Sequence, residues 1–111
     1  MDLPNNFKIY LKTQGASPAT IKNYLSDLNN FFNWLHQATG INHCIAGKSI
    51  FGLFTQETLK EYQSHLVREK TTLRTINCRF STLRKLGQFA QSQSWLKENA
   101  AEKIKNVQPK H

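Results

Sequence analysis

The feature that most constrains the fold of this chain is the apolar pattern between Ser17 and Leu35. A serine followed directly by a proline is a strong helix start, because the hydroxyl can cap free amide groups and proline suits the first turn. The apolar residues behind them fill one stripe of a helix: Ile21, Tyr24, Leu25, Leu28, Phe31, Phe32 and Leu35. With Gly40 as a stop signal, this pattern predicts a helix over 18–39.

Other segments repeat this helical period. Gly15 ends the first of them, Thr55 is an N-cap candidate for the third, and Thr71 or Thr72 for the fourth. The expected helices are 4–14, 18–39, 56–69 and 73–92, followed by a short fifth helix that Ser94 caps and that holds Trp95, Leu96 and Ile104. No segment alternates with period two, so we expect no sheet. The sequence predicts an all-α fold, a compact four-helix bundle with a short fifth C-terminal helix.

Length and composition limit the number of domains that this chain can form. A chain of 111 residues that is 39% hydrophobic can build one core but not two. We expect one domain over 1–107, with 108–111 as a linker or chain end. No apolar run reaches the ~20 residues that span a bilayer, and no signal peptide opens the chain, so we expect a cytoplasmic protein without membrane contact.

The residues that usually carry chemistry do not form a recognisable constellation. His43 and Cys44 are adjacent, but no spacing typical of a zinc site is present, and Cys44 and Cys78 are interpreted as free thiols. The seven acidic residues are scattered, and neither a glycine-rich phosphate loop nor a nucleophile motif occurs. We expect no metal, no cofactor and no catalytic site.

The charge balance points to a polyanionic partner. Fifteen Lys and Arg residues face seven Asp and Glu residues, which gives a net charge of +8. The segment from Arg68 to Lys85 holds six basic residues and one acid, Glu69. A helix that is merely kept soluble usually mixes both signs, whereas the expected helix 73–92 has no acid at all.

On a helical wheel, a set of basic and polar residues of this helix lies opposite its apolar stripe, and one arginine lies at the flank. The first set is Arg74, Asn77, Ser81, Arg84 and Lys85, and the flanking residue is Arg79. Arginine can bind a phosphate or a guanine edge through two hydrogen bonds, and asparagine can pair with adenine. Such a face suits the major groove of duplex DNA.

The helix over 18–39 has a polar but weakly charged outer face, which also suits a nucleic acid. Thr20, Lys22, Asn23 and Ser26 surround its N-terminal half. The amide groups and positive dipole end there could hold a phosphate. Ordinary capping by Ser17 is an alternative explanation, and both can hold, because a cap leaves other amide donors free. The aromatic residues Phe31, Phe32, Phe80 and Phe89 fall on apolar stripes and are expected in the core.

Three segments together resemble the core-binding domain of tyrosine recombinases, the phage-integrase family. They are "FKIYLKTQGASPATIKNYLSDLNNFFNWL", "FTQETLKEYQSHL" and "TLRTINCRFSTLRKLGQFAQSQSWL", and the resemblance covers about residues 3–107. Gly87 and Gln88 depart from the pattern, since relatives often carry bulky apolar residues there.

The resemblance implies a SAM-like helical bundle that forms half of a clamp around duplex DNA, whereas a separate domain catalyses strand exchange. It implies DNA contacts from the second and fourth helices, which carry Thr20, Lys22, Asn23, Arg74, Asn77, Arg79, Ser81, Arg84 and Lys85. It further implies a parent recombinase that assembles as a tetramer on DNA, and a chain that cannot cut DNA by itself.

Two alternatives remain open at this stage. A helical protein–protein interaction module would expose an apolar patch and would not bind duplex DNA. A helix-turn-helix regulator needs a turn of about 3–4 residues, which the segment from Lys70 to Thr72 could supply.

Overall fold

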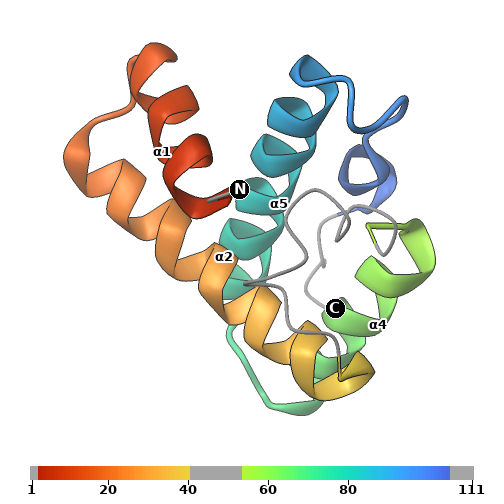
Figure 1. Ribbon diagram of the computed structural model, residues 1–111. Coiled ribbons are helices and arrows are strands. Elements are labelled where there is room, and N and C mark those ends of the chain that lie inside the picture. The colour runs from red at the N-terminus through yellow and green to blue at the C-terminus, as the bar shows by residue number, and fades with distance from the viewer. Residues whose placement is uncertain (1–2, 41–53, 106–111) are drawn as a thin grey trace. The chain divides into compact units, whose positions relative to one another are not determined.

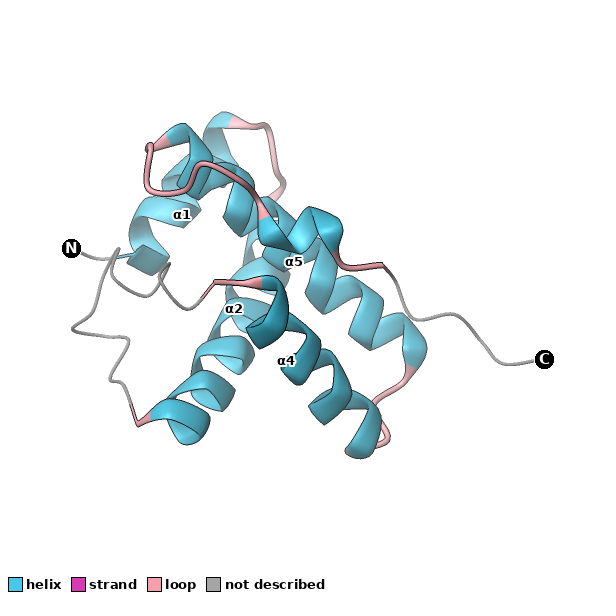
Figure 2. Cartoon of the chain, turned by 90° about the vertical axis from the view of Figure 1, so that its right-hand side faces the viewer, coloured by secondary structure: helices cyan, strands magenta, loops and turns pink. Residues whose placement is uncertain are grey.

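The computed structural model describes residues 3–40 and 54–105, and this part of the chain is helical, with no strand (Figures 1 and 2). The elements are α1 (Leu3–Thr13), α2 (Pro18–Thr39), α4 (Gln56–Arg68), α5 (Leu73–Ser92) and the 3₁₀ helix η2 (Ala100–Lys103). The all-α prediction is confirmed, and the four long helices begin and end within one residue of their predicted bounds. None of the helices described is both long and apolar enough to cross a bilayer.

Three helices begin with the same local structure. Ser17, Thr55 and Thr72 each accept a hydrogen bond from the backbone N–H three residues later, at 3.2 to 3.3 Å. In each case the residue that supplies this N–H is a threonine, whose hydroxyl also accepts from the capping hydroxyl at 2.9 to 3.1 Å. The sequence pattern Ser/Thr-x-x-Thr therefore satisfies one of the free amide groups at the start of α2, α4 and α5.

The four long helices each lead into a residue with left-handed backbone conformation. Gly15 and Gly40 follow α1 and α2 with φ of 82° and 76°, and Lys70 and Ser94 follow α4 and α5 with φ of 59° and 62°. At Gly15, Lys70 and Ser94 the helix ends in a Schellman motif. In the motif at Ser94, the Trp95 N–H donates to the Ala90 carbonyl at 2.9 Å.

The chain separates into two compact units, Met1–Ile50 and Phe51–His111. In the first unit, α1 packs along α2 through the apolar stripes that the sequence shows. The side chains of this core are Phe7, Leu11, Ile21, Leu28, Phe31, Phe32 and Leu35, all nearly inaccessible to solvent. Trp34 is half-buried and its ring stacks on that of Phe31, with centroids 6.1 Å apart.

In the second unit, α4, α5 and η2 pack against one another (Figure 2). Tyr62 and Phe80 contact each other at a centroid distance of 5.9 Å, and Phe89 meets Trp95 edge-on at 5.5 Å. Phe80 and Phe89 are buried, as are Phe31 and Phe32 in the first unit, so these four aromatics are core residues as predicted.

A short fifth helix follows α5, as predicted, but its cap and its extent were predicted wrongly. Ser94 does not cap a helix, because it closes α5 in the left-handed conformation. The cap is instead Asn99, whose side-chain oxygen accepts from the Ala101 N–H at 3.2 Å, and the element is a single 3₁₀ turn. Residues 41–53, which include His43 and Cys44, and residues 106–111 lie outside the described residues.

Candidate nucleic-acid interface

The outer side of α5 is polar, basic and free of acids over its whole length, from Leu73 to Ser92. Arg74 and Ser81 are exposed and Asn77 and Lys85 are half-buried, and all four lie on one side of the helix. Cys78, an exposed free thiol, and Gln88 lie on this side too. Neither was among the candidate DNA contacts, although the helical spacing places both on the side of Arg74. We call Arg74, Asn77, Ser81 and Lys85 the α5 basic face.

Arg84 does not belong to this face in the structure, although the wheel placed it opposite the apolar stripe. Its Nε donates to the Ala101 carbonyl at 3.3 Å and its Nη2 to the Ile104 carbonyl at 2.8 Å. The guanidinium therefore binds backbone acceptors at the end of η2, and it is half-buried there. The arginine ties the C-terminal segment to α5, and a role in binding DNA stays a prediction.

Arg79 lies at the flank of the apolar stripe, as the wheel placed it. It is half-buried, and its Nε is enclosed without a hydrogen-bond partner among the described residues. An enclosed Nε cannot reach a phosphate, so any DNA contact of Arg79 has to come from its terminal nitrogens.

At the N-terminus of α2, the three predicted residues have different environments. Lys22 and Asn23 are exposed, whereas Thr20 is half-buried and its hydroxyl accepts from that of Ser17. The cap therefore accounts for Thr20 without a ligand. The exposed face of α2 continues with uncharged amides, among them Asn30, whose Nδ2 donates to the Ser26 carbonyl at 3.1 Å. This face lies in the first unit and the α5 basic face in the second.

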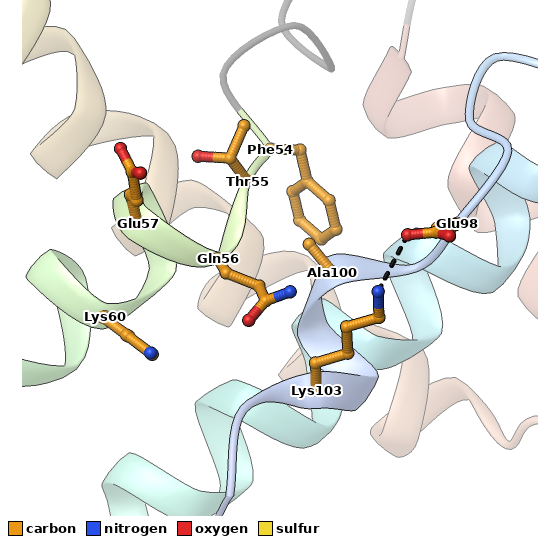
Figure 3. A pocket seen from close by; sticks show the side chains of 8 residues that line it. All are labelled: Phe54, Thr55, Gln56, Glu57, Lys60, Glu98, Ala100 and Lys103. Carbon is orange, nitrogen blue, oxygen red and sulfur yellow. Dashed lines mark hydrogen bonds and ion pairs between the residues drawn. The ribbon is translucent and has the colours of Figure 1, made fainter.

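A pocket of about 620 Å³ opens at the start of α4, between that helix and the C-terminal segment of the second unit (Figure 3). Lys103 donates to Glu98 across its rim at 2.8 Å, and Phe54 and Gln56 line its wall. The hydrogen bond from Lys103, and then its positive charge, lower the pKa of Glu98 below its usual value. Because the pocket carries carboxylates and ammonium groups alike, it does not select an anion.

The described residues contain no group of three histidine, cysteine or acidic side chains placed to hold a metal ion. Within the same residues, Lys103 and Glu98 form an ion pair at the rim of this pocket. Lys22 of α2 and Arg74 of α5 are exposed, which leaves their charge available to an external anion.

Comparison with known proteins decides the family. Residues 5–94 match the model of the family described as "Phage integrase, N-terminal SAM-like domain". The chain belongs to this family. The match covers most of α1 and all of α2, α4 and α5, which agrees with the resemblance that the sequence showed.

Two relatives carry the name tyrosine recombinase XerC. The protein of Chlamydia caviae is 30% identical over 109 residues, and that of Chlamydia muridarum is 27% identical over 110 residues. These matches cover 88% and 89% of this chain but 35% of each relative. The chain thus spans about a third of the length of the curated relatives it matches, in the part that corresponds to the non-catalytic N-terminal domain. No solved structure gives a significant match.

Proposed function

We propose that this chain is the core-binding domain of a site-specific tyrosine recombinase, and that it binds duplex DNA at the recombination site. The observation that carries the proposal is the α5 basic face, an acid-free helix side in a chain of net charge +8 that belongs to an integrase family. In this proposal the strand exchange itself is performed by a catalytic domain of the parent protein.

The contacts have different chemistry along the helix. Arg74 and Lys85 neutralise phosphates, and Asn77 and Ser81, between them, are placed to reach base edges or phosphates in the major groove. Lys22 and Asn23 add a second point of contact at the positive end of the α2 dipole. Arg79 contributes through its terminal nitrogens. Thr20 and Arg84 act mainly by holding the cap of α2 and the C-terminal segment in place.

The family match favours this function over the alternatives left open by the sequence. A helix-turn-helix regulator is not the family that residues 5–94 match, although the turn between α4 and α5 is short. The parent protein, in this proposal, acts in the cytoplasm as a tetramer on DNA.

The test is the salt dependence of binding to a labelled duplex, followed by fluorescence anisotropy. The isolated chain should bind weakly, with a dissociation constant of roughly 10⁻⁶ to 10⁻⁴ M near physiological salt. The variant with Arg74→Ala and Lys85→Ala should bind less tightly and should lower the slope of log K against log salt by about 2, because two phosphate contacts are lost.

The matched control replaces two lysines of the second unit that lie off the face, Lys60→Ala and Lys97→Ala. It removes the same charge and should leave the slope nearly unchanged. Equal slopes for both double variants would show that DNA binding follows net charge rather than the α5 basic face. No binding of the unmodified chain at low salt would contradict the proposed function as a whole.

A further inference from the structure

A groove of about 510 Å³ runs between α1 and α2 within the first unit. Its rim is formed by Lys8 and Lys12 from α1 and by Lys22 from α2, and its floor includes Pro18, Ile21 and Leu25. The floor residues follow the i, i+3, i+7 spacing of one helix side, so the groove runs along α2 for about two turns, or roughly 10 Å.

The charge around this groove is one-sided. Residues 3–40 contain three lysines and no arginine, and all three lysines line the groove. The same residues contain one acid, Asp27, which does not line it. None of the three lysines forms an ion pair with a described carboxylate. Every lysine between residues 3 and 40 therefore lines one groove, and no acid lines it.

The floor of the groove is apolar, which a binding site for phosphate alone would not need. Ile21 is 5% exposed and Leu25 is half-buried, so their accessible carbon surface faces the groove. Burying apolar side chains of a partner on this floor removes that surface from water. A positive rim around an apolar floor is complementary to a segment that presents apolar residues on one side and acids beside them.

We propose that the α1–α2 groove is a docking site for an acidic amphipathic helical segment of a partner protein. A second copy of this chain is a poor occupant, because each copy carries a net charge of +8. Duplex DNA would meet the lysines but has no apolar side to place on the floor. The proposal does not depend on the DNA-binding function of α5.

The probe is a fluorescein-labelled synthetic peptide of about 15 residues, or four helical turns. It carries leucines at i, i+3, i+4 and i+7 and glutamates elsewhere, and a scrambled peptide of identical composition disperses the leucines. Titrated with the full 111-residue chain, the patterned peptide should bind more tightly than the scrambled one. Amide NMR shifts should change around Lys8, Lys12 and Leu25.

Two variants separate the contributions of rim and floor. Lys8→Glu with Lys12→Glu should weaken peptide binding by about tenfold or more, since attraction becomes repulsion. Leu25→Asn should weaken it without changing its salt dependence, and a thermal melt checks that this variant is folded. The control, Lys97→Glu with Lys105→Glu, makes the same charge change at exposed sites of the second unit and should keep the affinity.

Several outcomes would overturn the proposal. They are equal binding of the scrambled peptide, equal loss in the control variant, no binding of the patterned peptide, or NMR shifts away from the groove. The groove would be part of the DNA interface instead if Lys8→Glu with Lys12→Glu weakened duplex binding but not peptide binding. Failure of DNA binding by the α5 basic face would leave these readouts unaffected.

Discussion

At the scale of single residues, the ends of the helices show where this chain holds strain. Ser94 has a φ of 62°, a left-handed conformation that costs an L-residue with a side chain about 1–2 kcal/mol. The variant Ser94→Gly should stabilise the protein by about 0.5–1 kcal/mol, because part of the relief is offset by the greater freedom of glycine in the unfolded chain. Its thermal midpoint should rise by roughly 2–8 °C.

The reciprocal control is Gly15→Ala, at a φ of 82° where an added Cβ would meet no atom within 4 Å. Backbone strain is then the sole change in the folded state. The thermal midpoint of Gly15→Ala should therefore fall by about as much as that of Ser94→Gly rises. A fall for Ser94→Gly would mean that the hydroxyl of Ser94 contributes more than its backbone conformation costs.

Single-residue signals were partly readable from the sequence. Ser17, Thr55 and Thr72 were candidates for N-caps and all three act as caps, because an N-cap depends on residues only three positions apart. Ser94 was a fourth candidate, but it closes a helix instead of opening one, and three residues later it has Lys97 where the three caps have a threonine. Small polar residues suit both positions, and the packing of Trp95 on Phe89 decides between them.

At the scale of elements, α5 and the C-terminal segment are joined by a contact that periodicity could not show. The Asn99 side chain lies against Gly87 and donates to the Arg84 carbonyl at 2.9 Å, while Arg84 donates to two carbonyls of the segment. Glycine at 87 departs from the bulky residues that the resemblance implies, and the structure gives the reason, since a Cβ there would overlap Asn99. A helical wheel describes one helix at a time, so it could not show that Arg84 binds the C-terminal segment.

This contact predicts a non-additive pair of substitutions. Gly87→Ala should destabilise the protein by about 1–3 kcal/mol through overpacking, and Asn99→Ala by about 1–3 kcal/mol through its lost hydrogen bonds. The double variant should cost less than the sum, because removing the Asn99 amide makes room for the new methyl group. Urea unfolding measures the cycle, and Gln88→Ala, an exposed neighbour on the same helix, should change stability by less than about 0.5 kcal/mol. Strict additivity would show that Gly87 and Asn99 do not share this space in solution.

At the scale of the whole molecule, the all-α class and the family were readable from the sequence because amphipathic periods and their order are local properties of the chain. The groove between α1 and α2 could not be predicted from the sequence, because Lys8 and Lys12 line a groove only where α2 packs beside α1. The i, i+4 spacing of these lysines was a visible signal, but without that neighbour it describes an ordinary solvated face.

If the chain binds DNA as proposed, its net charge of +8 predicts opposite effects of salt on the free protein and on the complex. In the free protein, like charges repel across the folded state, so raising NaCl from about 50 to 200 mM should raise the thermal midpoint by roughly one to a few degrees. With duplex DNA in excess, the midpoint starts higher because the ligand binds the folded state, and the same salt step should lower it as phosphate contacts weaken. Differential scanning fluorimetry measures the thermal midpoint in both series. In the variant with Arg74→Ala and Lys85→Ala, DNA should raise the midpoint by less. Without DNA, salt should still raise the midpoint of this variant. If salt lowered the midpoint of the free protein as well, attractive charge pairs would outweigh the repulsion that a net charge of +8 implies.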